Sequence, residues 1–317
     1  ALWFIFSPKP DYSSSEKRYL QKFPEVTAEK LLSGDFGSEF ETFFADRFPQ
    51  RNTWVGLNAY TALAEGNNGA SGVYNCKNGY LINKPVSTEN NLDKNIGAVA
   101  DFAKSIDTPT TVMLVPSTGY IVDDVLPTFH DKYNDDEDIS KISSTLSKDK
   151  IGFVDLRERF KSEYKNGSQI YYKTDHHWTT KGAYTGYQEL CKALGITPID
   201  DSTLKKDSYP DFYGTTYSSS GFWLTPPDNI EIWNNPKNSD RNISVKITEG
   251  ANIKTSGSMY FTDHLKEDDK YPVFIDGNHA LTEITNTNAK NGTILLIKDS
   301  FSHSLAPFLA ENYSKVV

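Results

Sequence analysis

Cysteine and long apolar runs are both scarce in this chain of 317 residues, and each shortage excludes a class of protein. The two cysteines, Cys76 and Cys191, lie far apart and match no CxxC or metal-ligand spacing. We therefore exclude a zinc–cysteine site and expect two buried thiols rather than a disulfide. No apolar run reaches 18 residues, which excludes a polytopic membrane protein.

Positive charge is also in short supply. The chain has 33 Lys and Arg residues against 42 Asp and Glu residues, a formal net charge of −9. Because phosphate binding needs a basic surface, we do not expect nucleic acid as a partner. Aromatic residues are plentiful, with 18 Tyr, 18 Phe and 5 Trp. This apolar surface can repay the entropy of ordering the chain, so the composition predicts a folded protein.

The first residues indicate a location outside the cytoplasm. The chain opens with six apolar residues and no initiator Met, and a polar, Ser-rich stretch follows. Six residues are too few to span a bilayer, but they can be the end of a removed signal peptide or membrane anchor. The alternative is a strand that covers the core. We expect residues 1–23 to be a tail at the cell envelope and residues 24–317 to form a single domain.

Strands and helices alternate along most of the chain. The Phe spacing over 24–64 predicts two helices separated at Pro49, and Asn78-Gly79 marks a hairpin turn within 72–82. Further helices are expected over 91–106, 138–148, 156–164, 180–194 and 302–312, and further strands over 111–115, 152–155, 169–173 and 293–298. This alternation predicts an α/β fold of three α/β/α layers with a mostly parallel central sheet. The strands near 111, 152 and 293 should lie parallel in that sheet.

Residues 200–292 have a different composition, rich in Asn, Asp, Ser, Thr, Gly and Pro. We interpret this stretch as an irregular insertion of loops and β-structure that shapes a cleft. Six aromatic residues lie within 209–223. They can stack on sugar rings or pack in the core of the insertion.

Two short segments carry the chemistry. Asp175-His176-His177-Trp178 is expected between a strand and a helix, and Lys298-Asp299-Ser300-Phe301 lies where an apolar strand ends. Parallel α/β folds bind ligands at the carboxyl ends of their strands. Together the segments offer a nucleophile, a base and an orienting acid, the groups that acyl transfer requires. Backbone N–H groups at a helix start near Ser300 would suit an oxyanion.

Each segment also has a plainer explanation. A Ser after a strand is commonly the N-cap of the next helix. The His pair can be structural, and Asp175, His176 and His177 have the donor types of a zinc or iron site. Trp178 on its own is typical of a core. The occurrence of both segments in one α/β pattern favours a hydrolase-like site.

Residues 174–184, Thr-Asp-His-His-Trp-Thr-Thr-Lys-Gly-Ala-Tyr, resemble the signature of the bacterial DHHW-motif protein family. That family is similar to the SGNH-type alginate O-acetylation proteins, whose motif is Asp-x-His-Trp followed by Thr-x-x-Gly-Ala. Lys298-Asp-Ser-Phe resembles the Gly-Asp-Ser block of the SGNH nucleophile, with Lys in place of Gly. Residues 44–51 and the segment from Val115-Pro116 to Leu126-Pro127 are similar to further elements of these proteins.

The resemblance implies an SGNH-hydrolase-like fold and a role for each motif residue. Ser300 would be the nucleophile, His177 the base and Asp175 the orienting acid. His176 occupies the variable position, and with Trp178 is a candidate for substrate or oxyanion contact. The chain stops 17 residues after Ser300, apparently inside the fold, before the Gly and Asn oxyanion donors of SGNH proteins would be expected. Asn278, in a Gly-Asn pair, is a candidate substitute, although Asp-Gly-Asn is also typical of a β-turn.

We therefore expect a serine-dependent O-acyl, chiefly O-acetyl, transferase or esterase that acts on a cell-surface polysaccharide and needs no cofactor or metal. The resemblance also implies a membrane-bound partner that exports acyl groups. Two other classes stay open. One is a non-catalytic carbohydrate-binding or envelope scaffold protein. The other is a metal-dependent hydrolase that uses the Asp-His-His cluster.

Overall fold

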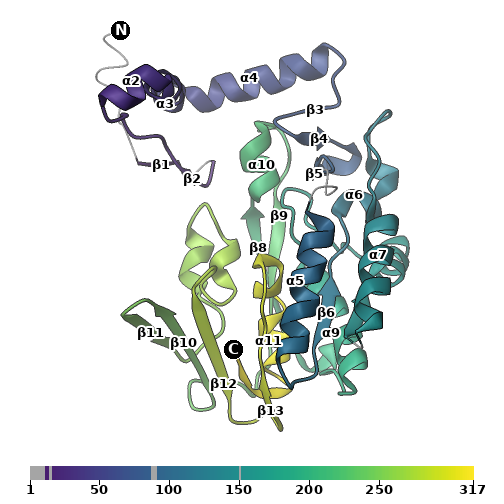
Figure 1. Ribbon diagram of the computed structural model, residues 1–317. Helices are drawn as coiled ribbons and strands as arrows, with labels where there is room; N and C mark the ends of the chain where they lie inside the picture. The colour runs from purple at the N-terminus through teal and green to yellow at the C-terminus, as the bar shows by residue number, and fades with distance from the viewer. Residues whose placement is uncertain (1–10, 14–15, 87–90, 150) are drawn as a thin grey trace.

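The computed structural model describes residues 11–13, 16–86, 91–149 and 151–317 (Figure 1). The apolar stretch at the start of the chain, interpreted above as an anchor remnant, lies outside these residues. Within them, no helix has the length and apolar character needed to cross a membrane.

The N-terminal region forms a short hairpin and three helices, which lie at the top of Figure 1. The hairpin pairs β1 (Tyr12–Ser13) with β2 (Arg18–Tyr19), and α2 (Ala28–Ser33), α3 (Asp35–Asp46) and α4 (Arg51–Ala64) follow. The predicted break at Pro49 is confirmed, because α3 ends before it and Gln50 has a left-handed φ of 55°.

A small sheet beneath α4 contains the predicted hairpin. Strand β3 (Gly69–Ala70) pairs with β4 (Val73–Asn75), which pairs with β5 (Leu81–Asn83) across a short 3₁₀ turn, η1 (Lys77–Gly79). Ala59 of α4 packs with Val73, Leu81 and the distant Phe222 in one buried cluster. The N-terminal helices are therefore fixed to the rest of the molecule through α4.

The α/β layering is clearest around β6 (Thr111–Leu114) and β7 (Gly152–Asp155), which pair in parallel as predicted. Helices α5 (Leu92–Ser105) and α7 (Asp135–Lys148) cover one face, where they pack with Val112 and Phe153. Met113 and Val154 point the other way, into the main core with α8 (Arg157–Lys165) and α9 (Thr180–Leu194). This alternation is the period-2 geometry of strands buried on both faces.

The expected mostly parallel central sheet is wrong. The largest sheet in the described part of the chain is mixed, in the order β11-β10-β12-β14-β13, and is separate from β6 and β7. It consists of β10 (Ile243–Glu249), β11 (Asn252–Ser256), β12 (Leu281–Asn286), β13 (Asn291–Ile294) and β14 (Tyr313–Val316). Within this mixed sheet, only β13 and β14 pair in parallel. The last segment of the chain, expected to be helical over 302–312, folds as η6 (Ser300–His303) and α11 (Ala306–Leu309) before β14.

The 200–292 stretch is more regular than expected. Strands β8 (Lys205–Phe212) and β9 (Asp228–Asn234) form a bulged antiparallel hairpin, and β10 to β12 belong to the mixed sheet. Alternating residues of β10 are buried, so its sequence Ile-Ser-Val-Lys-Ile has the pattern of a strand with one face on the core. Shorter elements complete the chain: α6 (Thr118–Ile121), η2 (Asp123–Val125), η3 (Asp201–Thr203), α10 (Thr215–Ser220), η4 (Thr262–Lys266) and η5 (Tyr271–Val273).

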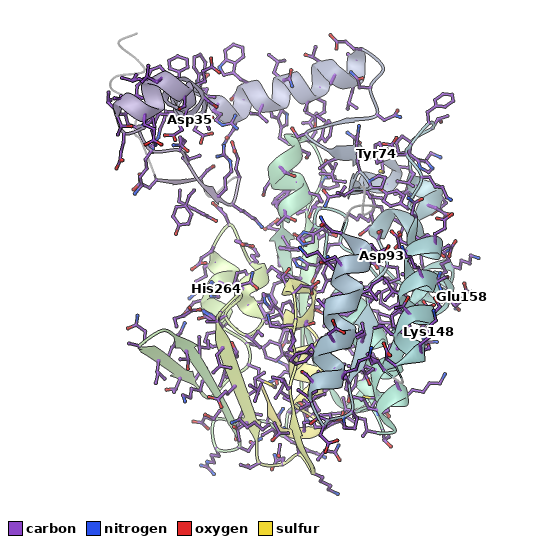
Figure 2. The ribbon with its side chains drawn as sticks, in the orientation of Figure 1. Asp35, Tyr74, Asp93, Lys148, Glu158 and His264 are labelled. Carbon is purple, nitrogen blue, oxygen red and sulfur yellow. The ribbon has the colours of Figure 1, made fainter. Side chains whose placement is uncertain are left out.

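Side chains from most of these elements meet in one large core (Figure 2). Both cysteines are buried within it and are free, as predicted. Burial raises the pKa of Cys76 to about 12 and that of Cys191 to about 11. The two thiols are therefore inert core residues.

Candidate active site

The Asp-His-His segment lies on a tight loop between α8 and α9, not after the strand expected over 169–173. A single bridge between Tyr171 and Trp178 closes this loop. The buried carboxylate of Asp228 holds its entry by accepting the Lys173 and Thr174 backbone N–H groups at 2.9 and 2.8 Å and the Thr174 hydroxyl at 2.7 Å. These hydrogen bonds satisfy backbone N–H groups that would pair with a neighbouring strand if the segment were part of a sheet.

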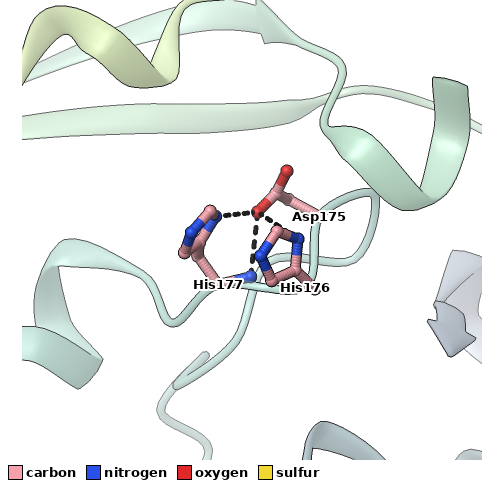
Figure 3. A group of neighbouring side chains, drawn as sticks. All are labelled: Asp175, His176 and His177. Atoms are coloured by element: carbon pink, nitrogen blue, oxygen red, sulfur yellow. Dashed lines mark hydrogen bonds and ion pairs between the residues drawn. The ribbon is translucent and has the colours of Figure 1, made fainter. Parts of the chain in front are cut away.

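The Asp175 carboxylate is buried, and both of its oxygens are engaged. Figure 3 shows the contacts of one oxygen, Oδ1, with His176 and His177. Oδ1 accepts the His177 backbone N–H at 2.8 Å and lies 2.5 Å from His177 Nδ1. Oδ2 accepts the backbone N–H of Thr215 at 2.6 Å and its hydroxyl at 3.1 Å. Gly214 makes this approach possible, because a Cβ at that position would lie 2.1 Å from the Asp175 Cβ.

His177 joins Asp175 to Ser300. Its Nε2 lies 2.8 Å from Ser300 Oγ, although the two residues are 123 positions apart in the sequence. A carboxylate only accepts hydrogen bonds, so Nδ1 carries the proton and Nε2 is left as the acceptor for the Ser300 hydroxyl. The three predicted residues thus form one continuous chain of hydrogen bonds, within the distance that proton transfer requires.

The surroundings of Asp175 keep its carboxylate ionised. Burial alone would raise the pKa of Asp175. The His177 hydrogen bond, the positive charge of His177 and His176 when they are protonated, and the Thr215 N–H outweigh that effect. The net result is a pKa well below the usual range for Asp. Burial lowers the pKa of His176, and the nearby Asp175 offsets only part of that effect. His176 is therefore neutral at pH 7.

His176 faces a different partner from His177. Its Nδ1 lies 2.5 Å from the Thr215 hydroxyl. Because Thr215 gives its only hydroxyl proton to Asp175, it must accept the proton of His176 Nδ1. The Nε2 of His176 is then an acceptor. His176 thus contacts Thr215, the residue that holds the Asp175 carboxylate.

Trp178 is fully buried and ties the loop to η6. Its N–H is shared between Phe301 O and Ser304 Oγ, each at 2.9 Å. The indole N–H of Trp178, expected as a candidate for substrate or oxyanion contact, is thus already engaged within the protein. These bonds keep the loop that contains His177 in register with Ser300.

Two aromatic residues that sequence reasoning assigned no role enclose the His177 ring. Tyr271 stacks on it with 3.9 Å between ring centroids and 11° between planes, and Phe301 meets it edge-on at 4.9 Å. The Tyr271 hydroxyl also donates to Ser300 O at 3.2 Å. Phe301 adjoins Ser300 in sequence, but no local signal connects Tyr271 or Thr215 to the site. Both belong to the 200–292 stretch, which was expected to shape a cleft.

The oxyanion donors are less clearly placed. Asn278 is exposed, just beyond a turn that includes Gly277, and none of the hydrogen bonds described joins it to Asp175, His177 or Ser300. The Phe301 backbone N–H, one of the amides expected to face an oxyanion, donates instead to the Asp299 carboxylate at 3.0 Å. Asp299 is therefore the N-cap of η6.

The cluster of Asp175, His176 and His177 also has the composition of a metal site. Possible ligand atoms of the three lie within 4.8 Å of one another. In the geometry observed, however, His177 Nδ1 and Asp175 Oδ1 are bonded to each other and His176 Nδ1 is bonded to Thr215. A cation bound through Nδ1 of either histidine would have to displace these bonds.

Solved structures of a DHHW family protein and of PatB1 have the same fold as this chain. A DHHW family protein from Eubacterium siraeum has a TM-score of 0.62 and 19% identity, covering 78% of this chain and 82% of that one. Bacillus cereus PatB1 with a sulfonyl adduct has a TM-score of 0.61 and 19% identity, covering 77% and 83%. The O-acetyltransferase domain of Pseudomonas putida AlgJ scores 0.47 at 13% identity, covering 77% and 78%.

Among curated proteins, no sequence matches this chain. A family model does match it: the model of the DHHW protein family covers residues 83–317, most of the chain and all of the loop and η6 segments described above. The resemblance first noted in residues 174–184 is thereby confirmed, and the chain belongs to the DHHW protein family.

Proposed function

We propose that this protein is a serine-dependent O-acyl transferase or esterase that acts on O-acetyl groups of a cell-surface polysaccharide. One observation carries the proposal, the hydrogen-bond chain from Asp175 Oδ1 through His177 to Ser300 Oγ, with distances of 2.5 and 2.8 Å. These are the parts and the order of a nucleophile, a base and an orienting acid.

In the proposed first step, Ser300 Oγ attacks the carbonyl carbon of an acyl donor and its proton passes to His177 Nε2. Asp175 stabilises the resulting imidazolium and keeps Nδ1 directed at its carboxylate. When the tetrahedral intermediate collapses, the bond to the leaving oxygen breaks and that oxygen takes the proton from His177. An acyl-serine remains.

In the second step, an acceptor hydroxyl gives its proton to His177 Nε2 as its oxygen attacks the acyl-serine. Collapse of that intermediate returns the proton to Ser300. A sugar hydroxyl as acceptor gives transfer, and water gives hydrolysis. None of these steps calls on a cofactor.

The similar structures support this assignment without extending it. PatB1 was solved with a sulfonyl adduct, the covalent product that an electrophilic sulfonyl reagent leaves on a nucleophile. A polysaccharide substrate, a place outside the cytoplasm and a membrane-bound partner that delivers acyl groups all belong to the proposal, and each follows from the family resemblance rather than from a contact in the structure.

Hydrolysis of a small activated acetyl ester tests the proposed nucleophile. The Ser300→Ala variant should lose this activity down to the small residual rate that binding alone provides. Ser302→Ala is the matched control, since Ser302 lies on the same 3₁₀ turn and forms no side-chain hydrogen bond among those described. An unchanged rate in Ser300→Ala would remove Ser300 from the mechanism.

Two measurements separate the other classes. A serine-directed fluorophosphonate should label Ser300, whereas a non-catalytic scaffold with the same motif would stay unlabelled. Metal analysis of the purified protein, with activity measured after chelation and zinc addition, tests the Asp-His-His cluster. Activity that a chelator abolishes and zinc restores would favour the metal-dependent hydrolase.

A further inference from the structure

A pocket of about 490 Å³ lies between the N-terminal region and α10. Its wall from α10 contains Ser218 and Ser219. These residues follow Thr215, which bonds both Asp175 and His176. Ser218 is three residues along the helix from Thr215, or about 4.5 Å along the helix axis. The pocket is therefore about one helical turn from the residue that holds the acid.

The opposite wall comes from the N-terminal hairpin and α4. Glu16 and Arg18 line the pocket, and Lys17 between them fixes the hairpin near the active site. The buried Lys17 ammonium donates to Tyr213 O at 2.8 Å, two residues before Thr215, and pairs with Asp269 at 3.0 Å. The pocket thus adjoins the segment that enters α10.

Helix α4 is held by close packing against the residues that follow α10. A Cβ at Gly56 would lie 1.8 Å from the Trp223 ring, and the Tyr60 hydroxyl accepts the Leu224 N–H at 2.9 Å. Tyr60 also meets Phe222 edge-on at 5.6 Å. These contacts fix the position of the α4 side chains that face the pocket.

The chemistry of the lining is that of a carbohydrate site. Trp54 lines the pocket with 53% of its surface exposed, which offers a large rigid face for a sugar ring. Asn58 and Ser71 also line it, and neither side chain appears in the hydrogen bonds described. The hydroxyl protons of Ser218 and Ser219 bond helix carbonyls, which leaves their oxygens free to accept. A flat apolar face with a few neutral polar groups matches a sugar ring and its hydroxyls.

Charge in the pocket argues for a neutral sugar. The two guanidinium groups of Arg18 and Arg51 are matched by carboxylates: Arg18 pairs with Glu16 at 2.7 Å and Asp46 at 2.5 Å, and Arg51 pairs with Glu16 at 3.1 Å. The site thus has no surplus positive charge for a carboxylate ligand. The whole chain, at −9, would also repel an anionic polymer.

We propose that this pocket binds an uncharged sugar unit of the acceptor polysaccharide, beside the helix that holds the Asp175 carboxylate. The inference rests on the proposed acyl transfer. Apart from Ser218 and Ser219, every lining residue precedes residue 83, where the match to the family model begins. Selection of the acceptor would therefore reside largely in the N-terminal region, outside the part that the family model describes.

Binding of defined tetrasaccharides by the full chain tests the proposal. Neutral chitotetraose and cellotetraose and the anionic tetragalacturonate are titrated by calorimetry. At least one neutral tetrasaccharide should bind, and tetragalacturonate should bind at least tenfold more weakly. Trp54→Ala should weaken neutral binding by about tenfold, and Trp54→Phe should recover part of the loss. Leu57→Ala is the matched control, because Leu57 is a similarly exposed apolar residue of α4 (51%) outside the lining.

The small-ester assay distinguishes failure of this inference from failure of the proposed function. Leu57→Ala should hydrolyse the small ester and bind the neutral tetrasaccharide like the wild type, and Ser300→Ala should lose ester hydrolysis but bind the tetrasaccharide normally. The inference is overturned if neither neutral sugar binds, if Trp54→Ala and Leu57→Ala behave alike, or if tetragalacturonate binds as tightly as the neutral sugars. The acyl-transfer proposal fails separately, by unchanged ester hydrolysis in Ser300→Ala.

Discussion

His176 and His177 are neighbours in the chain, yet their rings have different partners. His177 lies between Asp175 and Ser300, and His176 bonds Thr215. Adjacent side chains of an extended segment point in different directions, whereas residues two apart lie on the same side. This geometry agrees with the assignment that the family resemblance implies, in which Asp175 acts with His177 and not with His176. The structure has the same pairing.

The pairing predicts unequal effects of substitution. His177→Ala should lower kcat/KM for the small acetyl ester by about 10²–10⁴-fold, because it removes the general base. Asp175→Asn should lose somewhat less, and His176→Ala little beyond any loss of folded protein. Ester kinetics measure the three effects, with folding checked by circular dichroism. The assignment is inverted if His176→Ala is inactive and His177→Ala active. If both are inactive and a bound metal is lost with them, the cluster is a metal site.

At the scale of elements, local patterns predicted regular helices and strands well. Helix α9 was predicted with the bounds that the structure has, because a Thr N-cap, an apolar face and Gly195 mark its ends. Strand β7 was likewise predicted with its observed bounds, and β6 was predicted from a short run rich in β-branched residues. The strand expected over 169–173 is instead a loop, since Asp228 accepts the Lys173 and Thr174 N–H groups from 55 and 54 residues away. No local pattern signals a partner at that distance.

Partners that are distant in the sequence also explain why the arrangement of the sheet and part of the candidate site were not predicted. The strand expected over 293–298 was predicted to share one sheet with β6 and β7. The structure has β13 over Asn291–Ile294 instead, paired with β14 in the mixed sheet. The three catalytic candidates came from motifs, which are short and local. Thr215 and Tyr271 complete the site from the 200–292 stretch, and their roles depend on tertiary contacts alone.

Close packing between α10 and the Asp175 loop makes Gly214 a sensitive position. Its φ of −90° is open to any residue, so the requirement is space rather than backbone freedom. Gly214→Ala should force Asp175 or the start of α10 to move, with a cost of about 1–3 kcal/mol and a loss of ester hydrolysis. Urea unfolding and ester kinetics measure the two effects.

Gly97→Ala is the matched control for this substitution. Gly97 lies inside α5, and a Cβ there would meet no atom within 4 Å. Ala is favoured over Gly in a helix interior, so this variant should gain about 0.5–1 kcal/mol and keep full activity. A Gly214→Ala protein with normal stability and activity would show that the Asp175 loop yields more readily than its contacts indicate.

For the whole molecule, the buried imidazole of His303 is expected to govern stability in mild acid. His303 is 2% exposed, and neither ring nitrogen has a hydrogen-bond partner within the described part of the chain. Burial lowers its pKa to about 3, and the charges of Lys298, His177 and His279 contribute. An unfolded His has a pKa of about 6.5. Between these values only the unfolded chain binds the proton, so stability falls as the pH falls from about 6.5 towards 3.

His303→Phe should therefore flatten the pH dependence of unfolding between pH 6.5 and 4.5, where the wild-type slope from this residue is at most about 1.4 kcal/mol per pH unit. Urea titrations at intervals of half a pH unit measure the slope.

His264, on η4 (Figure 2), provides a control because its pKa is shifted in the opposite direction from that of His303. Burial alone would lower its pKa, but the hydrogen bonds to Glu267 and Asp276 raise it. The folding stability that this raised pKa contributes is fully present below the unfolded pKa and is lost as the pH rises through the folded pKa. His264→Asn should thus lower stability by a constant amount below about pH 6.5 and leave unchanged the slope that His303→Phe flattens. Equal slopes in the two variants between pH 6.5 and 4.5 would place the acid sensitivity elsewhere.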